Sequence, residues 1–375
     1  MRFSVPLVRV LGIPIRLNFS WFLTFGFVTL VLALEVFPSS LPDSSPRVHW
    51  ALGLASGLLF FASIVVHELA HSFVARAYGI PVKGITLFIF GGVAQIAREA
   101  TRPLVEFVMA IAGPLTSVLL AGIFFSLWLL SDSASGSPLH VMWEWLWLMN
   151  IVVGIFNMAP GFPMDGGRVL RSIIWGLTGN FRRSTFIASW CGRGIAYLMI
   201  GTGMAGAFGV LEWISPASSF LFVLMGFFLE GAARQSWQQL RLLDFLRGFR
   251  ADELMARNLP TVDVRLTLRD AVPGGVDLRR VCLLAVESER VVGIVTEAEL
   301  RAVKAQDWNT TTVAQAMLPA DNIRTASLTT DLTSVLQAME EESTRFTPIV
   351  EDGRVLGVVA RESIIRLLMS HKLLS

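Results

Sequence analysis

The sequence predicts a polytopic α-helical membrane protein with small membrane-associated β segments, followed by a soluble α+β region. Hydrophobic residues make up 53% of its 375 residues and charged residues only 16%, whereas soluble domains carry about 25% charged residues. Apolar stretches long enough to cross a bilayer recur through the first 230 residues, and charged residues become frequent only after Arg234. A helical membrane region with a soluble tail follows from this distribution.

About six spanning helices are expected, each an apolar stretch bounded by proline, glycine or charged residues. They cover residues 21–37, 50–77, 104–130, 141–157, roughly 187–210 and 217–233. Two other stretches predict strands. Residues 3–19 alternate and contain prolines, and residues 83–97 are β-branched with Gly91-Gly92 in the middle, which indicates a tight turn or bulge. Such backbone is tolerated at membrane depth only against protein or a wet cavity, so we expect the hairpin to pack against the second helix.

Basic residues gather in alternate loops, which predicts the orientation. The loops on the opposite side of the membrane contain almost no basic residues besides Arg47. By the positive-inside rule, both termini lie in the cytoplasm and the protein is a multi-pass protein of the plasma membrane. The arginines near the start also argue against a cleavable signal, and two cysteines in different regions argue against a disulfide framework. The basic residues that set the orientation are Arg2, Arg9, Arg16, Arg76, Lys83, Arg98, Arg102, Arg168, Arg171, Arg182, Arg183, Arg234, Arg241, Arg247 and Arg250.

The second predicted helix contains the motif His-Glu-x-x-His. His67 and His71 are four residues apart and share one helix face, so both can bind one metal ion, while Glu68 beside them can hold or deprotonate a water molecule. The motif has only three fixed positions and occurs by chance in soluble helices. Three such side chains are costly in a membrane helix, however, which favours a functional role. The motif lies roughly 10–15 Å inside the cytoplasmic end of the helix, within reach of water.

A hydrolytic zinc site usually has three protein ligands, so one ligand is missing. Asp165, in the sequence Pro-Gly-Phe-Pro-Met-Asp-Gly-Gly-Arg after the fourth span, is the best candidate because the turn can bend it inward at a comparable depth. The alternative is a turn or helix-capping aspartate that pairs with Arg168. Glu106 is expected to pair with Arg102, four residues earlier.

Residues 234–250 form a basic amphipathic linker, which is typical of a helix on the anionic inner membrane surface. From residue 251 the sequence repeats, with Met255 corresponding to Met317 and Gly293 to Gly357. Residues 251–375 are therefore expected to contain two copies of one small module, about 251–306 and 313–372.

The membrane part, residues 1–233, resembles the site-2 protease family of intramembrane zinc metalloproteases. The resemblance rests on His67-Glu68-Leu69-Ala70-His71 in a membrane helix, on residues 157–168 downstream, and on the Phe90-Gly91-Gly92 segment. It implies His67, His71 and Asp165 as ligands of one Zn²⁺ and Glu68 as the catalytic base. It also implies Asn157 as an active-site residue near the substrate carbonyl, although Asn157 could equally cap the broken backbone before Pro160.

The resemblance implies a zinc-dependent endopeptidase that cleaves the membrane segments of single-span proteins in the bilayer, as in regulated intramembrane proteolysis. Two alternatives stay open: a metal carrier or channel with a regulatory tail, and an inactive scaffold. Polar residues along several spans on both sides of the midplane would indicate transport, but here they gather on the cytoplasmic side. Nucleic acid is not an expected partner.

The C-terminal repeats resemble a tandem pair of CBS (cystathionine-β-synthase-type) modules, through Gly293-Ile294-Val295-Thr296 and residues 357–360. Such pairs often bind adenine nucleotides through a Thr or Ser and an Asp. The resemblance implies Thr296 and Glu299 as candidate contacts in the first copy, where Glu replaces the Asp. The second copy departs further, with Ala360 and Ser363. Regulation of the protease, homodimerisation and a purely structural role are therefore all carried forward.

Overall fold

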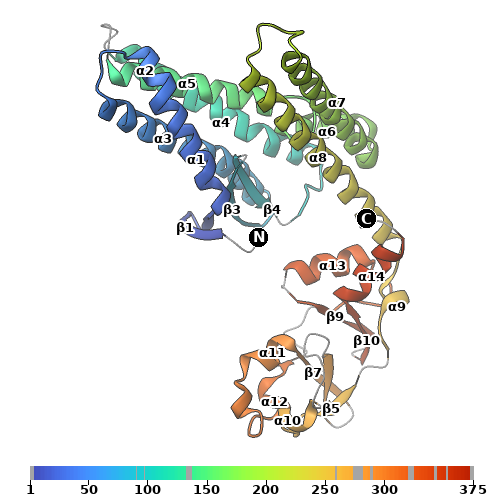
Figure 1. Cartoon of the computed structure of the whole chain (residues 1–375). Helices are drawn as coiled ribbons and strands as arrows, with labels where there is room; N and C mark the ends of the chain where they lie inside the picture. Colours follow the sequence, from blue (N-terminus) through green and yellow to red (C-terminus); the bar gives the residue numbers. More distant parts are fainter. Residues whose placement is uncertain are drawn as a thin grey trace. The chain divides into compact units, whose positions relative to one another are not determined.

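The computed structural model describes residues 4–89, 91–96, 98–131, 137–257, 260–272, 282–287, 290–319, 325–341, 344–351 and 354–371. The chain divides into two compact units, Met1–Trp237 and Gln238–Ser375, and the boundary falls inside the predicted linker. The first unit is mainly helical, and the second mixes short helices with strands (Figure 1).

The first unit contains long helices and one small sheet. The helical elements are α1 (Phe19–Val31), a π-helical turn η1 (Leu32–Val36), α2 (Phe37–Ser40), α3 (Pro46–Ala77), α4 (Pro103–Leu130), α5 (Pro138–Asn157), α6 (Asp165–Thr178), α7 (Phe181–Ala207) and α8 (Pro216–Arg247). The strands are β1 (Ser4–Val10), β2 (Ile13–Asn18), β3 (Val82–Phe88) and β4 (Gly91–Ile96). The strands predicted in residues 3–19 and 83–97 are thus confirmed, although Phe90 lies outside the described residues.

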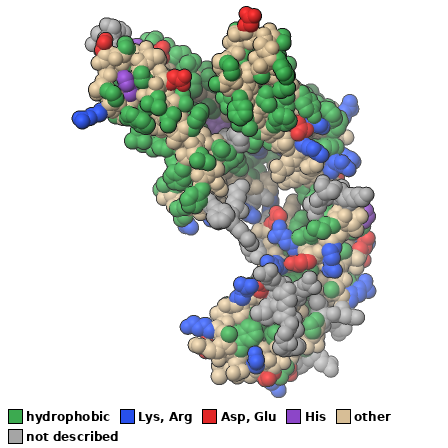
Figure 2. Space-filling model, viewed as in Figure 1, with side chains coloured by type: hydrophobic (Ala, Val, Ile, Leu, Met, Phe, Trp, Pro, Cys, Tyr) green, Lys and Arg blue, Asp and Glu red, His purple; other side chains and the backbone are tan. Residues whose placement is uncertain are grey.

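Apolar side chains cover much of the surface of this unit (Figure 2), as a lipid-facing protein requires. Among the described residues, five helical segments are long and apolar enough to cross a membrane: Phe19–Ser40, Pro46–Ala77, Pro103–Leu130, Pro138–Asn157 and Pro216–Arg247. Helix α7, the predicted fifth span, is 27 residues long but is not among them. It carries Arg182, Arg183 and Arg193, which lower its hydropathy. A total of six spans therefore stays a prediction.

The four strands form one sheet in the order β1-β2-β3-β4. β1 pairs with β2 and β3 with β4 in antiparallel fashion, while β2 and β3 run parallel, with Ile15 opposite Ile85. Ile13, Ile15 and Ile85 are buried together with Leu69 of α3, so the sheet packs on the helix that carries the metal motif. β4 lies at one edge of this sheet, so among the described residues no strand pairs with its outer side.

The predicted basic linker is not a separate helix. Residues 234–247 continue α8, and Leu246 near its end is buried in the second unit among Leu332, Val335 and Met339. The second unit contains α9 (Ala251–Leu254), β5 (Thr261–Asp263), α10 (Leu268–Ala271), β6 (Cys282–Glu287), β7 (Arg290–Thr296), α11 (Glu297–Ala302), η3 (Ala305–Asp307), α12 (Val313–Ala316), β8 (Leu318–Pro319), α13 (Leu332–Glu341), β9 (Phe346–Glu351), β10 (Arg354–Ala360) and α14 (Arg361–Ser370).

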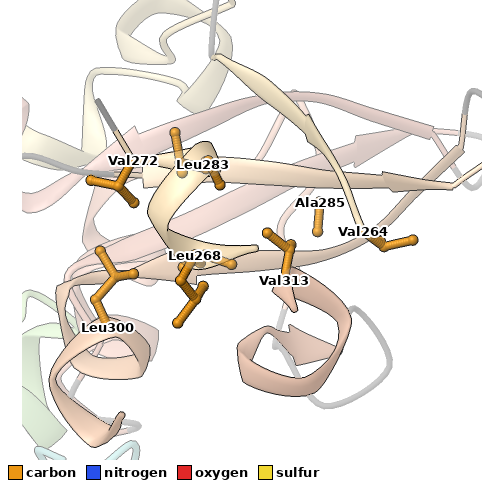
Figure 3. Packing of buried hydrophobic residues seen from close by; sticks show 9 residues of the cluster. Val264, Leu268, Val272, Leu283, Ala285, Leu300 and Val313 are labelled. Carbon is orange, nitrogen blue, oxygen red and sulfur yellow. The ribbon is translucent and has the colours of Figure 1, made fainter. Parts of the chain in front are cut away.

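The second unit contains two hydrophobic cores, as two copies of one module would, and the division into two CBS copies stays a prediction. Val264, Leu268, Leu283, Ala285 and Val313 belong to the first (Figure 3). Their sheet has the order β5-β6-β7-β8, and β9 and β10 form a two-stranded sheet beside the second core.

The leading segment of each copy packs on a strand of the other copy. A Cβ built at Gly293 on β7 would lie 2.7 Å from Met317 Sδ, and one built at Gly357 on β10 would lie 3.1 Å from Met255 Sδ. Ala256 likewise bridges to Val358. The two glycines therefore serve the same purpose, because each lets the other copy's methionine approach the strand.

Candidate metal centre

Helix α3 places His67 and His71 on one buried face. Each histidine is only 4% exposed, and the two Nε2 atoms are 3.2 Å apart. The spacing of four residues brings the two rings over one another on successive turns. The helical placement predicted from the motif is confirmed.

Asp165 approaches the same point from a different part of the chain. It is the first residue of α6, and its Oδ2 lies 3.1 Å from Nε2 of His67 and 3.1 Å from Nε2 of His71. The structure thus brings together the three side chains that the sequence singled out as candidate metal ligands. The alternative was a turn or helix-capping aspartate that pairs with Arg168. Asp165 does lie at the start of a helix, and its Oδ2 contacts both histidines there.

The donor set fits a zinc ion. Two imidazole nitrogens and one carboxylate oxygen are ligands that Zn²⁺ takes, and bonds of about 2.0–2.1 Å in a tetrahedron separate the donors by about 3.3 Å. The distances of 3.1–3.2 Å among the three atoms are close to that separation. Since these atoms present lone pairs to one another when the imidazoles are neutral, a cation between them relieves the repulsion.

Helix α4 orients both histidines. His71 Nδ1 donates to the carbonyl oxygen of Met109 over 2.6 Å, which leaves Nε2 free for a metal, and His67 Nδ1 lies 2.8 Å from Ser117 Oγ. Such partners of the second ring nitrogen fix the tautomer and orientation of metal-binding histidines. Gly113 lies between them on the same helix, where a Cβ would stand only 2.2 Å from His71 Nε2 and 2.5 Å from His67 Nε2. Glycine therefore keeps the space open.

Glu68 faces the β3–β4 hairpin. Its Oε2 accepts a hydrogen bond from the backbone N–H of Ala94 over 3.1 Å. A Cβ at Gly92 would come within 2.6 Å of Glu68 Cγ, so only glycine at this position lets β4 pack so closely. The prediction that the hairpin packs against the motif helix is confirmed.

Glycines also explain the turn that carries Asp165. A Cβ at Gly192 of α7 would overlap the carbonyl oxygen of Phe162, and one at Gly161 would lie 2.3 Å from Gly192 N. Phe162 N donates to the carbonyl of Ala188, also on α7. Residues 158–164 are thereby pressed onto α7, and α6 starts at Asp165. The sequence interpretation extended the irregular region to Arg168, but helix begins three residues earlier because Gly166 and Gly167 can pack against the turn.

The remaining predicted site residues make local contacts. Asn157 ends α5, and its amide donates to the carbonyl of Val153 over 3.0 Å, one turn earlier. Thr296 and Glu299 form a capping box at the start of α11, in which Thr296 N donates to Glu299 Oε2 over 2.9 Å. These contacts are structural, and the predicted roles in substrate or nucleotide binding stay predictions.

The expected pairing of Glu106 with Arg102 is wrong. Glu106 pairs with Arg171 of α6, whose Nε donates to Glu106 Oε1 over 2.6 Å. Arg102 precedes the first turn of α4 with extended backbone (φ −137°, ψ 142°), so its side chain does not follow the helical spacing of four residues. Sequence reasoning missed Arg171, Gly113, Ser117 and the Met109 carbonyl. Arg171 gave one local signal, because it is the single charged residue among residues 169–177.

The fold and the site together define a membrane-embedded metallohydrolase centre, with two histidines and an aspartate around one point and a glutamate beside them. The comparisons with known proteins agree. Residues 56–134 and 127–201 match the model of peptidase family M50, and residues 313–370 match the CBS domain.

Similarity to several proteins runs along nearly the whole chain. It is 34% identical, over 99% of its length and 97% of the relative's, to sll0528 of Synechocystis sp., which carries the name of a zinc metalloprotease. It is 27% identical over 98% of its length and 96% of the relative's to the zinc metalloprotease MJ0392 of Methanocaldococcus jannaschii. Among solved structures, the site-2 protease from M. jannaschii is 30% identical and covers 63% of this chain and 95% of that one, with a TM-score of 0.42.

This chain belongs to peptidase family M50, the site-2 protease family. It is a multi-pass membrane zinc metalloprotease with a C-terminal CBS region.

Proposed function

We propose that the protein cleaves membrane-spanning segments of single-span proteins inside the bilayer, with His67, His71 and Asp165 holding one Zn²⁺ and Glu68 acting as general base. The observation that carries this proposal is the convergence of three donor atoms within 3.2 Å of one another. Two of them belong to α3, which is apolar enough to span a membrane, and the third belongs to Asp165 at the start of α6. Three such groups buried in a membrane protein are costly unless they act together.

Each residue has a distinct part in the chemistry. When bound, Zn²⁺ supplies a Lewis acid that polarises the scissile carbonyl and activates a water molecule. Glu68, adjacent in sequence to His67, accepts a proton from the attacking water and passes it to the leaving amine. Met109 and Ser117 hold the imidazole rings in place, so little reorganisation is needed during the reaction.

The edge strand β4 supplies a place for the substrate. A peptide bond inside a helix is shielded, so a membrane substrate must unwind locally, and its freed backbone groups then need partners that lipid cannot give. An extended substrate that adds to the free edge of β4 obtains them. The backbone N–H of Ala94, which donates to Glu68 Oε2 in the absence of substrate, lies on this strand. Substrate pairing there takes over this donor, places the substrate beside Glu68 and releases the carboxylate for its role as base.

The orientation and the C-terminal unit complete the proposal. The distribution of arginines supports cytoplasmic termini in the plasma membrane, which puts the site near cytoplasmic water. The CBS region regulates cleavage or joins two copies of the chain. Support for regulation comes from α8, which continues without a break from an apolar segment to residues buried in the CBS core. In the first copy, Thr296 and Glu299 already satisfy one another, which favours a structural role for them over nucleotide binding.

A cleavage assay with matched variants tests the proposal. A tagged single-span substrate is co-expressed with the wild type, with Glu68→Gln, and with Glu144→Gln, which makes the same change at an exposed position of α5. We expect Glu68→Gln to lower the cleavage rate by at least about 10²-fold, as loss of a general base does, while zinc stays bound. Glu144→Gln should cleave like the wild type. Undiminished cleavage by Glu68→Gln would contradict the proposal, and metal transport without cleavage by the wild type would favour the carrier.

A further inference from the structure

Arg171 is a buried arginine on the helix that starts with Asp165. The residue is 7% exposed, and its guanidinium makes contacts in three directions. Nε donates to Glu106 Oε1 over 2.6 Å and Nη2 contacts the same oxygen, while Nη1 lies 3.6 Å from Glu99 Oε1. The guanidinium carbon also lies 5.0 Å from the centre of the Phe162 ring and 4.7 Å from that of Phe181.

These partners belong to the parts of the chain that define the metal centre. Glu106 is one turn before Met109 on α4, and the Met109 carbonyl holds His71. Phe162 lies in the turn three residues before Asp165, and Phe181 begins α7, on which that turn rests. One side chain therefore joins the helix that orients the histidines, the turn that carries the aspartate, and the helix beneath that turn.

We infer that Arg171, held by Glu106, is a positioning residue that sets the distance between Asp165 and the two histidines. This inference rests on the proposed metal centre. Asp165 and Arg171 are separated by less than two turns of α6, so a fixed Arg171 fixes the start of that helix. Metal ligands must be placed to within about 0.2 Å, and the ion pair supplies the restraint from the α4 side.

The burial of the pair explains why arginine is suited to the position. Glu106 is 1% exposed, so water cannot solvate its carboxylate. The charge is stabilised instead by the ion pair with Arg171. Arginine has a planar guanidinium that donates to a carboxylate and stacks on aromatic rings at once. Lysine keeps the charge but loses the planar donor pair and the stacking against Phe162 and Phe181. The two substitutions therefore separate charge from geometry.

Metal affinity measured on the purified full chain in detergent tests the inference. Zn²⁺ binding is determined by competition with a chromophoric chelator, and Co²⁺ absorption reports the coordination geometry. We expect Arg171→Ala to weaken Zn²⁺ binding by about 10- to 100-fold, as substitutions behind a metal ligand do. Arg171→Lys should weaken binding less than Arg171→Ala and alter the Co²⁺ spectrum, and Glu106→Gln should weaken it in the same sense. These two conservative variants keep the test decisive if Arg171→Ala fails to fold.

Arg193→Ala is the matched control. Arg193 forms another arginine–glutamate pair within the helical unit, with Nε 3.3 Å from Glu230 Oε1, and connects α7 to α8. We expect it to change thermal stability but not Zn²⁺ affinity. Wild-type affinity in both Arg171→Lys and Glu106→Gln, or an equal loss in Arg193→Ala, would overturn the inference. Asp165→Ala distinguishes failure of this inference from failure of the proposed metal centre, because undiminished Zn²⁺ binding in that variant would contradict the metal centre itself.

Discussion

Gly113→Ala should remove the metal from the site without altering any ligand. The new methyl group would stand 2.2 Å from His71 Nε2 and 2.5 Å from His67 Nε2, whereas ordinary contacts begin at 3.4 Å. The rings or helix α4 must therefore move by about 1 Å, several times the tolerance of about 0.2 Å in metal–ligand distances. Gly122→Ala on the same helix is the control, because nothing lies within 4 Å of its Cβ.

The assay is Zn²⁺ competition on the purified chain together with cleavage of the single-span substrate. We expect Gly113→Ala to bind Zn²⁺ at least about 10²-fold more weakly than the wild type, beyond the 10- to 100-fold cost of disturbing an outer-shell partner, because both rings are displaced. Gly122→Ala should match the wild type. Normal Zn²⁺ affinity in Gly113→Ala would refute the claim that α4 closes over the metal-binding face of the histidines.

Three further predictions concern the hairpin and the CBS unit. Ala94→Pro removes the N–H that faces Glu68 and should lower kcat/KM for an extended substrate by about tenfold, whereas Ala94→Gly keeps the donor and should cleave nearly normally; equal activity of the two would exclude pairing there. Burial raises the pKa of the Cys282 thiol to about 12, so folded protein at pH 9 should resist alkylation at Cys282. Stability should also fall as pH rises from roughly 8.5 toward about 12, because the unfolded thiol ionises first. Peptide mapping after alkylation checks the first point. A pH series of thermal melts checks the second, in which stability should fall less steeply with pH in Cys282→Ser than in the wild type. Gly357→Ala places a Cβ 2.7 Å from the Ala256 carbonyl and should destabilise the CBS unit by about 1–3 kcal/mol in a thermal melt, whereas Gly231→Ala should not.

The metal motif could be predicted from the sequence because its geometry is local. A spacing of four residues on a helix places His67 and His71 together whatever the rest of the chain does. The hairpin was also predictable, since Gly91-Gly92 in a short β-branched stretch is a local turn signal. Asp165 needed more, and its identification depended on how rare carboxylates are in the apolar part of the chain.

The supports of the site could not be predicted, because they depend on pairings between distant helices. Arg171 and Glu106 are 65 residues apart, and local spacing favoured Arg102 for the glutamate. Gly113 before Pro114 looks like an ordinary helix irregularity until α4 is placed over the histidines. The exchange of Met255 and Met317 between the CBS copies is likewise invisible in the repeat itself, which shows correspondence but not contact.

Zinc content and cleavage, measured on the same preparations, decide whether Asp165 completes the metal centre. Purified wild-type chain, Asp165→Ala and Glu68→Gln are compared by elemental analysis after equilibration with a weak chelator, and their cleavage rates are measured in parallel. We expect one Zn²⁺ per chain in the wild type and in Glu68→Gln, loss of Zn²⁺ from Asp165→Ala, and cleavage by the wild type alone. Full zinc content together with normal cleavage in Asp165→Ala would rule out a metal centre formed by His67, His71 and Asp165.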